Sequence, residues 1–214
     1  MSFSLATLAQ AETFELNYGG DSYKFDMFET NETSEQFYLN AVFGSSFSVN
    51  WHDTGIKDAL TVFAHRSTLT GLASLGFIFD SYYDQSAGQF SGTLFAPGSS
   101  LILSDDYGEA VPVIPGSGIY DLGFAWNEEQ VDGILIEMLS PETLPFVLSS
   151  TYKDNVNNLV IASPDANNGL LTPVAYDGSD IVISTVSAVP EPSTYALMLG
   201  GLGLVGFMAA RRRV

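Results

Sequence analysis

The chain lacks cysteine altogether and has few basic side chains. Its 214 residues include two histidines and seven lysines or arginines, against 25 aspartates or glutamates. The absence of cysteine excludes disulfide bonds, a thiol nucleophile and cysteine-ligated zinc or iron–sulfur sites. The formal net charge of −18 repels nucleic acid and anionic lipid, so we expect no nucleic-acid partner.

The few basic residues are unevenly placed. Three of the seven are Arg211, Arg212 and Arg213, and residues 1–187 hold 24 acidic residues against four basic ones, a formal charge of −20. Such a surface suits a solvated secreted domain or one that collects cations. A length of roughly 180 residues is enough for one domain with a sizeable core.

Motifs of catalysis are also missing. His52 and His65 lie on different predicted strands, without the close spacing typical of zinc or non-haem iron ligands. The serine clusters lack the Gly-x-Ser-x-Gly form of a hydrolase nucleophile. With 25 acids, some facing pair such as Glu128 and Glu137 is always available, so it carries no information on glycosidase activity. We therefore expect that the protein is not an enzyme, and the alternative is a secreted hydrolase.

The dominant pattern that is present has a period of two. Phe14, Leu16 and Tyr18 alternate with Glu15 and Asn17, as in a strand with one buried face. The same pattern predicts strands at 23–27, 36–43, 47–51, 60–65, 75–83, 89–95, 101–104, 119–126, 133–139, 146–152, 158–162, 170–176 and 180–186.

Breaks rich in glycine, proline, asparagine and aspartate separate most of these segments. Many short strands at regular spacing predict an all-β fold, an antiparallel β-sandwich of jelly-roll-like order. Short helical turns are expected only at 31–36, where Thr33 or Ser34 caps the turn, and at 128–131.

The first residues have the composition of the end of a signal peptide. Apolar and small residues from Leu5 onward end in Ala9-Gln10-Ala11, the A-x-A form of a cleavage site. No basic residue precedes this stretch, and its apolar part is shorter than the apolar region of an ordinary signal peptide. We therefore expect residues 1–11 to be the remnant of a longer signal peptide. The alternative is that residues 1–11 are a disordered terminus or the terminus of the first strand.

The last 26 residues have three parts in order. These are Val189-Pro190-Glu191-Pro192, an uncharged apolar run from Tyr195 to Ala210, and the cluster Arg211-Arg212-Arg213. As a helix the run rises about 24 Å, slightly less than the roughly 30 Å of a bilayer core, so its flanks have to help it span. Tyr195 suits one interface, and the arginines stay on the cytoplasmic side. This predicts a single transmembrane helix with the preceding domain exported.

The order of a Pro-Glu-Pro turn, an apolar helix and an arginine cluster resembles the sorting tail of bacterial PEP-CTERM proteins. The resemblance covers only residues 189–213. It implies that an exosortase-family membrane protease acts near Pro190 to Pro192, after a transient stay in the inner membrane. It also implies that the protein comes from a Gram-negative bacterium whose surface proteins accompany exopolysaccharide. Exopolysaccharide is therefore an expected partner. A plain membrane anchor is the alternative.

Three acidic loops offer oxygen ligands of the kind that Ca²⁺ takes, and Ca²⁺ is the one cofactor that we predict. The alternative for each loop is an Asx turn, in which the side chain bonds its own backbone. The candidate ligands are Asp165 and Asn167, Asp105 and Asp106, and Asp177 and Asp180.

Aromatic residues suggest a second kind of binding. Tyr82 and Tyr83 precede Asp84 in a segment that reads as a loop, so an exposed ring there is a candidate for stacking on a sugar. Trp51 and Trp126 lie in alternating runs and are expected in the core instead.

The sequence therefore predicts three segments: a signal-peptide remnant at 1–11, a β-sandwich domain at 12–187 and a sorting and anchor tail at 188–214. The predicted function is that of a non-catalytic cell-surface or extracellular-matrix protein, of structural or binding type, associated with exopolysaccharide or a biofilm. A calcium-dependent carbohydrate-binding module is the first alternative.

Overall fold

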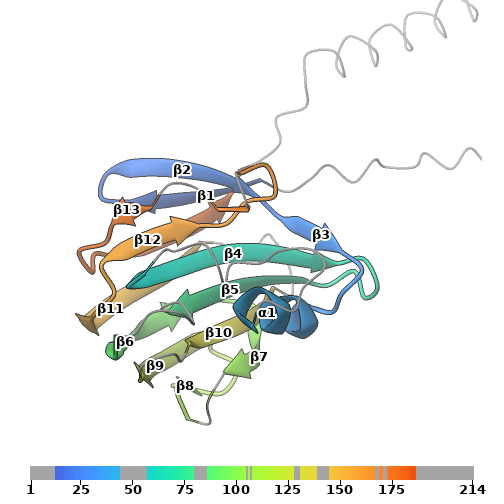
Figure 1. The fold of residues 1–214 in the computed structure, drawn as a ribbon. Helices are drawn as coiled ribbons and strands as arrows, with labels where there is room; N and C mark the ends of the chain where they lie inside the picture. The colour runs from blue at the N-terminus through green and yellow to red at the C-terminus, as the bar shows by residue number, and fades with distance from the viewer. Residues whose placement is uncertain are drawn as a thin grey trace, which may run out of the picture. The chain divides into compact units, whose positions relative to one another are not determined.

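The strands of the protein form two sheets. In this computed structural model the described residues are 13–43, 57–79, 86–104, 106, 108–127, 131–138, 145–166, 169–170 and 173–186. All pairings in the first, sheet A, are antiparallel. Its order is β2 (Asp21–Asp26), β1 (Thr13–Tyr18), β14 (Ile181–Thr185), β11 (Phe146–Asp154), β6 (Gly88–Phe95), β9 (Ile119–Trp126) and β8 (Ala110–Pro112) (Figure 1).

Sheet B is mixed. Its order is β13 (Val174–Ala175), β12 (Asn158–Ile161), β4 (Ala59–Ser67), β5 (Ala73–Phe79), β10 (Asp132–Met138) and β7 (Ser99–Ser104), and β3 (Phe28–Thr30) also pairs with β4. Both β12 and β3 run parallel to β4. The all-β class is thus confirmed, whereas purely antiparallel pairing is wrong at these two places. Parallel neighbours need a long connection, and helix α1 supplies one between β3 and β4.

Side chains from both sheets meet in a shared core, as in a sandwich. Every second residue of β9 is buried, which is the alternation expected of a strand with one covered face. Phe79 of sheet B has its ring centre 4.5 Å from that of Phe90 and 4.7 Å from that of Phe124, both on sheet A. Trp126 lies 6.3 Å from the same ring and is 2% exposed, so its predicted place in the core is confirmed.

Residues predicted as a strand at 36–43 belong instead to helix α1 (Ser34–Phe43). The buried residues Phe37, Tyr38 and Ala41 have helical spacing. The helix begins with a capping box: the Thr33 N–H donates to Gln36 Oε1 at 3.0 Å, and the Gln36 N–H donates to Thr33 Oγ1 at 3.2 Å. The predicted capping role of Thr33 is confirmed, and the cap starts a longer helix than the predicted turn.

Helix α1 covers the outer face of sheet B. Nearly every residue of β4 and β5 is buried, which indicates strands covered on both faces. The helix contacts β4, β5 and β10 (Figure 1), with the Phe37 ring centre 5.6 Å from that of Phe63. A Cβ atom at Gly133 would overlap the Tyr38 hydroxyl, so this close approach requires glycine.

Several predicted segments lie partly or wholly outside the described residues. Among the described residues, no helix is long and apolar enough to cross a membrane, and the predicted span at 195–210 falls outside them. The predicted strand at 47–51 and residues 128–130 also fall outside. Residues Ala11–Val186 form one compact unit by their internal contacts. The assignment of the two ends as signal-peptide remnant and sorting tail rests on the sequence.

Candidate functional site

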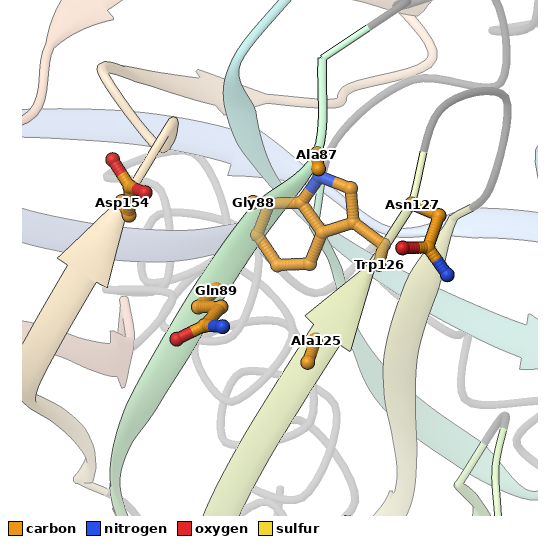
Figure 2. Close-up of a pocket in the computed structure, with 7 residues that line it drawn as sticks. All are labelled: Ala87, Gly88, Gln89, Ala125, Trp126, Asn127 and Asp154. Carbon is orange, nitrogen blue, oxygen red and sulfur yellow. The ribbon is translucent and has the colours of Figure 1, made fainter.

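A hollow of about 290 Å³ opens where β6 begins and where β9 and β11 end (Figure 2). Its size is close to the lower limit for small-ligand sites, roughly 300 Å³. Among the described residues that line it, the polar side chains are two amides and one carboxylate, and none is basic. The described lining residues are Ala87, Gly88, Gln89, Ala125, Trp126, Asn127 and Asp154.

The strand register brings three of these residues into one row. Gln89 is the partner of Ala125 on β9 and of Asp154 on β11. Partners on neighbouring strands project from the same face of a sheet. All three are exposed, so the row lies on the outer face of sheet A, away from the shared core. Figure 2 shows Gln89 and Asp154 on adjacent strands.

A β-bulge in β11 decides which of its side chains reach this face. The pairing with β6 continues residue by residue to Ser150 and resumes with Tyr152 opposite Ser91, so Thr151 is an extra residue. Its hydroxyl donates to the Ser91 carbonyl at 3.1 Å. One extra residue reverses the alternation after it. Tyr152 and Asp154 therefore face outward instead of into the core.

The same reversal turns Lys153 toward the inner side of the strand. Its Nζ donates to the Val156 carbonyl at 2.9 Å and lies 5.6 Å from the centre of the Tyr176 ring. These contacts hold the ammonium group through a hydrogen bond and a cation–π interaction. The outer face next to the hollow therefore keeps its carboxylate and does not gain a positive charge from this strand.

Tyr152 begins a second row beside the hollow. It is 53% exposed and is the partner of Ser91, which in turn is the partner of Gly123. A Cβ atom at Gly123 would have no heavy atom within 4 Å, so the surface there is open. The exposed ring of Tyr152 thus lies beside a strip of small residues on the outer face, formed by Ser91, Gly123 and Ala125.

Trp126 lines the hollow from the core side. Its register partner is Gly88, where a Cβ atom would overlap the indole ring (Figure 2). A side chain at position 88 would displace the indole, so the shape of the hollow depends on this glycine. Nε1 of Trp126 is buried and finds no hydrogen-bond acceptor among the described residues.

Three carboxylates converge at another place in the described part of the chain. Oxygens of Asp106, Glu109 and Asp132 all lie within 4.8 Å of one another, and Asp132 is 5% exposed. The backbone N–H of Asp106 donates to Glu109 Oε2 at 3.0 Å. Of the three, only Asp106 was predicted as a cation ligand. Three carboxylates are fewer donors than the six to eight oxygens that Ca²⁺ takes.

Other predicted calcium ligands have roles in the fold. Oδ1 of Asp177 accepts hydrogen bonds from the Ser179 N–H at 2.8 Å and from the Tyr18 hydroxyl at 2.9 Å. These hydrogen bonds lower the pKa of the Asp177 carboxyl. The bond to Ser179 is that of an Asx turn, the alternative expected for this loop. Asp165 accepts a hydrogen bond from the Ser163 hydroxyl.

The remaining predicted site residues are not brought together by the described structure. Asp180 is exposed beside the turn at Asp177. The others lie outside the described residues: Asp105, Asn167, Tyr82, Tyr83, the sequence motif from Val189 to Pro192 and the cluster of Arg211, Arg212 and Arg213.

His65 is buried between two hydroxyl groups. Its Nε2 is 2.9 Å from Thr30 Oγ1, its Nδ1 is 3.2 Å from Ser34 Oγ, and its ring stacks on Phe37 with 4.3 Å between centres. Burial lowers the pKa of His65 to about 4. The imidazole thus joins β4 to β3 and to the start of α1, which is a structural role. His52 lies outside the described residues.

The described residues define an all-β protein with a small polar hollow on one sheet. Residues 188–213 match the family model of the PEP-CTERM protein-sorting motif, which confirms the resemblance seen in the tail. This motif implies a protein that is exported and sorted by an exosortase. No curated protein and no solved structure matches the chain.

Proposed function

We propose that the protein is a non-catalytic component of the cell surface or extracellular matrix, associated with exopolysaccharide and delivered there through its tail. The observation that carries the proposal is the sorting motif at residues 188–213. The acidic β domain of jelly-roll-like type is the part that remains outside. Its formal charge of −20 favours a solvated surface.

The tail acts in steps set by its three parts. The apolar run from Tyr195 to Ala210 stops in the inner membrane, and Arg211 to Arg213 stay on the cytoplasmic side. The Val189 to Pro192 turn is then presented to the exosortase at the outer side of that membrane. Cleavage near Pro190 separates the β domain from its anchor, so the domain is released or attached at the surface.

The hollow on sheet A supports a binding role better than a hydrolytic one. Glycosidases use two facing carboxylates, either as acid and base or as acid and nucleophile. The described lining of the hollow contributes one, Asp154. A secreted hydrolase accordingly ranks below a structural or binding protein.

The tail is expected to be removed only where an exosortase is present. Intact-mass spectrometry of the exported protein should show the loss of the residues from about Pro190 onward in such a host, and their retention in a host without the protease. Replacing Pro190, Glu191 and Pro192 together by alanine should preserve the full tail in both hosts. Pro164→Ala, in an exposed turn of the β domain, is the matched control and should be processed normally. Equal masses in both hosts would leave only a plain anchor.

Calcium binding stays a prediction, and Asp106 is the residue to test first. Extracellular calcium sites bind with Kd values near 10⁻⁴ to 10⁻³ M, so about 10 mM Ca²⁺ should raise Tm by about 5 °C. Asp106→Asn should remove most of this shift, because Asp106 lies beside Glu109 and Asp132. Asp21→Asn, at an exposed position of β2, should leave it intact. Thermal unfolding in the absence of Ca²⁺ and in Mg²⁺ provides the baselines, and equal shifts for both variants would remove this cluster from consideration.

A further inference from the structure

The outer face of sheet A carries an exposed aromatic ring next to a polar hollow, and the two are aligned by the strands. Tyr152 and Asp154 are two residues apart on β11, which is about 7 Å along a strand. Asp154 lines the hollow with Gln89 and Asn127. Between Tyr152 and the far side of the hollow lie the small residues of β6 and β9. Together, Tyr152, these small residues and the hollow form a surface called the sheet A groove below. We infer that the sheet A groove binds a neutral saccharide chain.

The donor set of the groove fits sugar hydroxyls. A hydroxyl both donates and accepts, and the groove offers one carboxylate that accepts and two amides, on Gln89 and Asn127, that do both. Charged acceptors make the stronger hydrogen bonds, so Asp154 is the group that orients the ring in the hollow. The exposed ring of Tyr152 offers a flat apolar face on which the neighbouring sugar unit of the chain can stack.

The charge of the domain selects against acidic sugars. The described part of the lining contains no lysine or arginine, and the reversal at the bulge holds Lys153 against Val156 and Tyr176. The excess of acidic residues in 1–187 repels an anionic polymer from the whole surface. The ligand class is therefore a neutral glycan, with hexose or N-acetylhexosamine units, and not a uronic-acid polymer.

The backbone keeps the groove open at two points. Gly123, between Tyr152 and the end of β9, leaves empty space where other residues carry a side chain. The β-bulge at Thr151 is the second point, since without it Tyr152 and Asp154 would face the core. Bulges that redirect side chains in this way are over-represented beside functional sites.

The inference goes beyond the sorting function and does not depend on the tail. The test uses the purified full chain in isothermal titration calorimetry with neutral hexasaccharides of glucose, mannose and N-acetylglucosamine, and with hexagalacturonate as the anionic probe. At least one neutral probe should bind, and hexagalacturonate should bind more weakly than that probe. Tyr152→Ala and Asp154→Ala should each weaken binding by about tenfold.

Two further variants separate stacking from general damage to the surface. Tyr152→Phe keeps the ring and should bind within about twofold of the wild type. Leu69→Ala removes an exposed side chain, 66% exposed, from the turn between β4 and β5 and should bind normally. Binding of no neutral probe, tighter binding of hexagalacturonate, or unchanged binding by Tyr152→Ala would each overturn the inference. None of these results bears on removal of the tail, which is measured by mass.

Discussion

Replacing Phe79 by alanine is expected to lower the free energy of unfolding by about 4 kcal/mol, the typical cost of removing a fully buried phenylalanine. Phe79 is fully buried on β5 of sheet B. Its ring stacks or packs at 4.5 to 6.3 Å, centre to centre, on three aromatic residues of sheet A: Phe90, Phe124 and Trp126. The truncation therefore removes contacts that join the two sheets and leaves a cavity between them.

Equilibrium urea unfolding, followed by far-ultraviolet circular dichroism, measures this loss. Phe95→Ala is the matched control, because it makes the same chemical change at a side chain that is 42% exposed on the outer face of sheet A. The control is expected to cost less than about 1 kcal/mol. Similar losses for the two variants would mean that Phe79 does not join the sheets in solution.

Lowering the pH from 7 to 4 is expected to cost about 3 kcal/mol of stability through His65 alone. The ordinary pKa of histidine is 6.5, and burial lowers that of folded His65 to about 4. Between these pH values the unfolded chain binds a proton that the folded chain does not. The contribution is therefore fully present above pH 6.5 and is lost as the pH falls toward 4.

The comparison of wild type with His65→Gln isolates this effect. Glutamine retains one donor and one acceptor for Thr30 and Ser34, but it does not titrate. The two proteins carry the same carboxylates and differ only at residue 65, so the difference between the two urea midpoints should shrink as the pH falls from 7 to 4. If the urea midpoints of the wild type and of His65→Gln differed by the same amount at every pH, the result would contradict a buried, neutral imidazole at His65.

The strands could be predicted where one face is buried. At 119–126 the alternation of apolar and polar residues gave the bounds of β9 as the structure has them. The three-residue strands β3 and β8 are too short to display a period, and they were missed. At 36–43 the spacing of Phe37, Tyr38 and Ala41 together with the capping pair Thr33 and Gln36 outweighed the β-prone aromatics.

The sorting tail could be predicted from the sequence, whereas the sheet A groove could not. The tail is a contiguous pattern, so the sequence alone was enough to recognise it, and the family match at 188–213 agrees. The groove depends on the partners of Gln89 across three strands and on one extra residue in β11. Asp106, Glu109 and Asp132 likewise meet only through the fold. Register and bulges are not visible as local patterns, so these groupings were missed.

The position of β14 in sheet A bears on when the domain can fold. This strand pairs with β1 on one side and with β11 on the other, so until it arrives β1 and β2 are not joined to the rest of the sheet. The pairing of residue 14 with residue 185 is also a contact between the two ends of the domain, of the kind that makes folding slow. In a chain that crosses the membrane from its N-terminus, the sheet is completed only when the residues just before the sorting motif have emerged. For an exported chain, translocation of nearly the whole β domain thus precedes completion of sheet A.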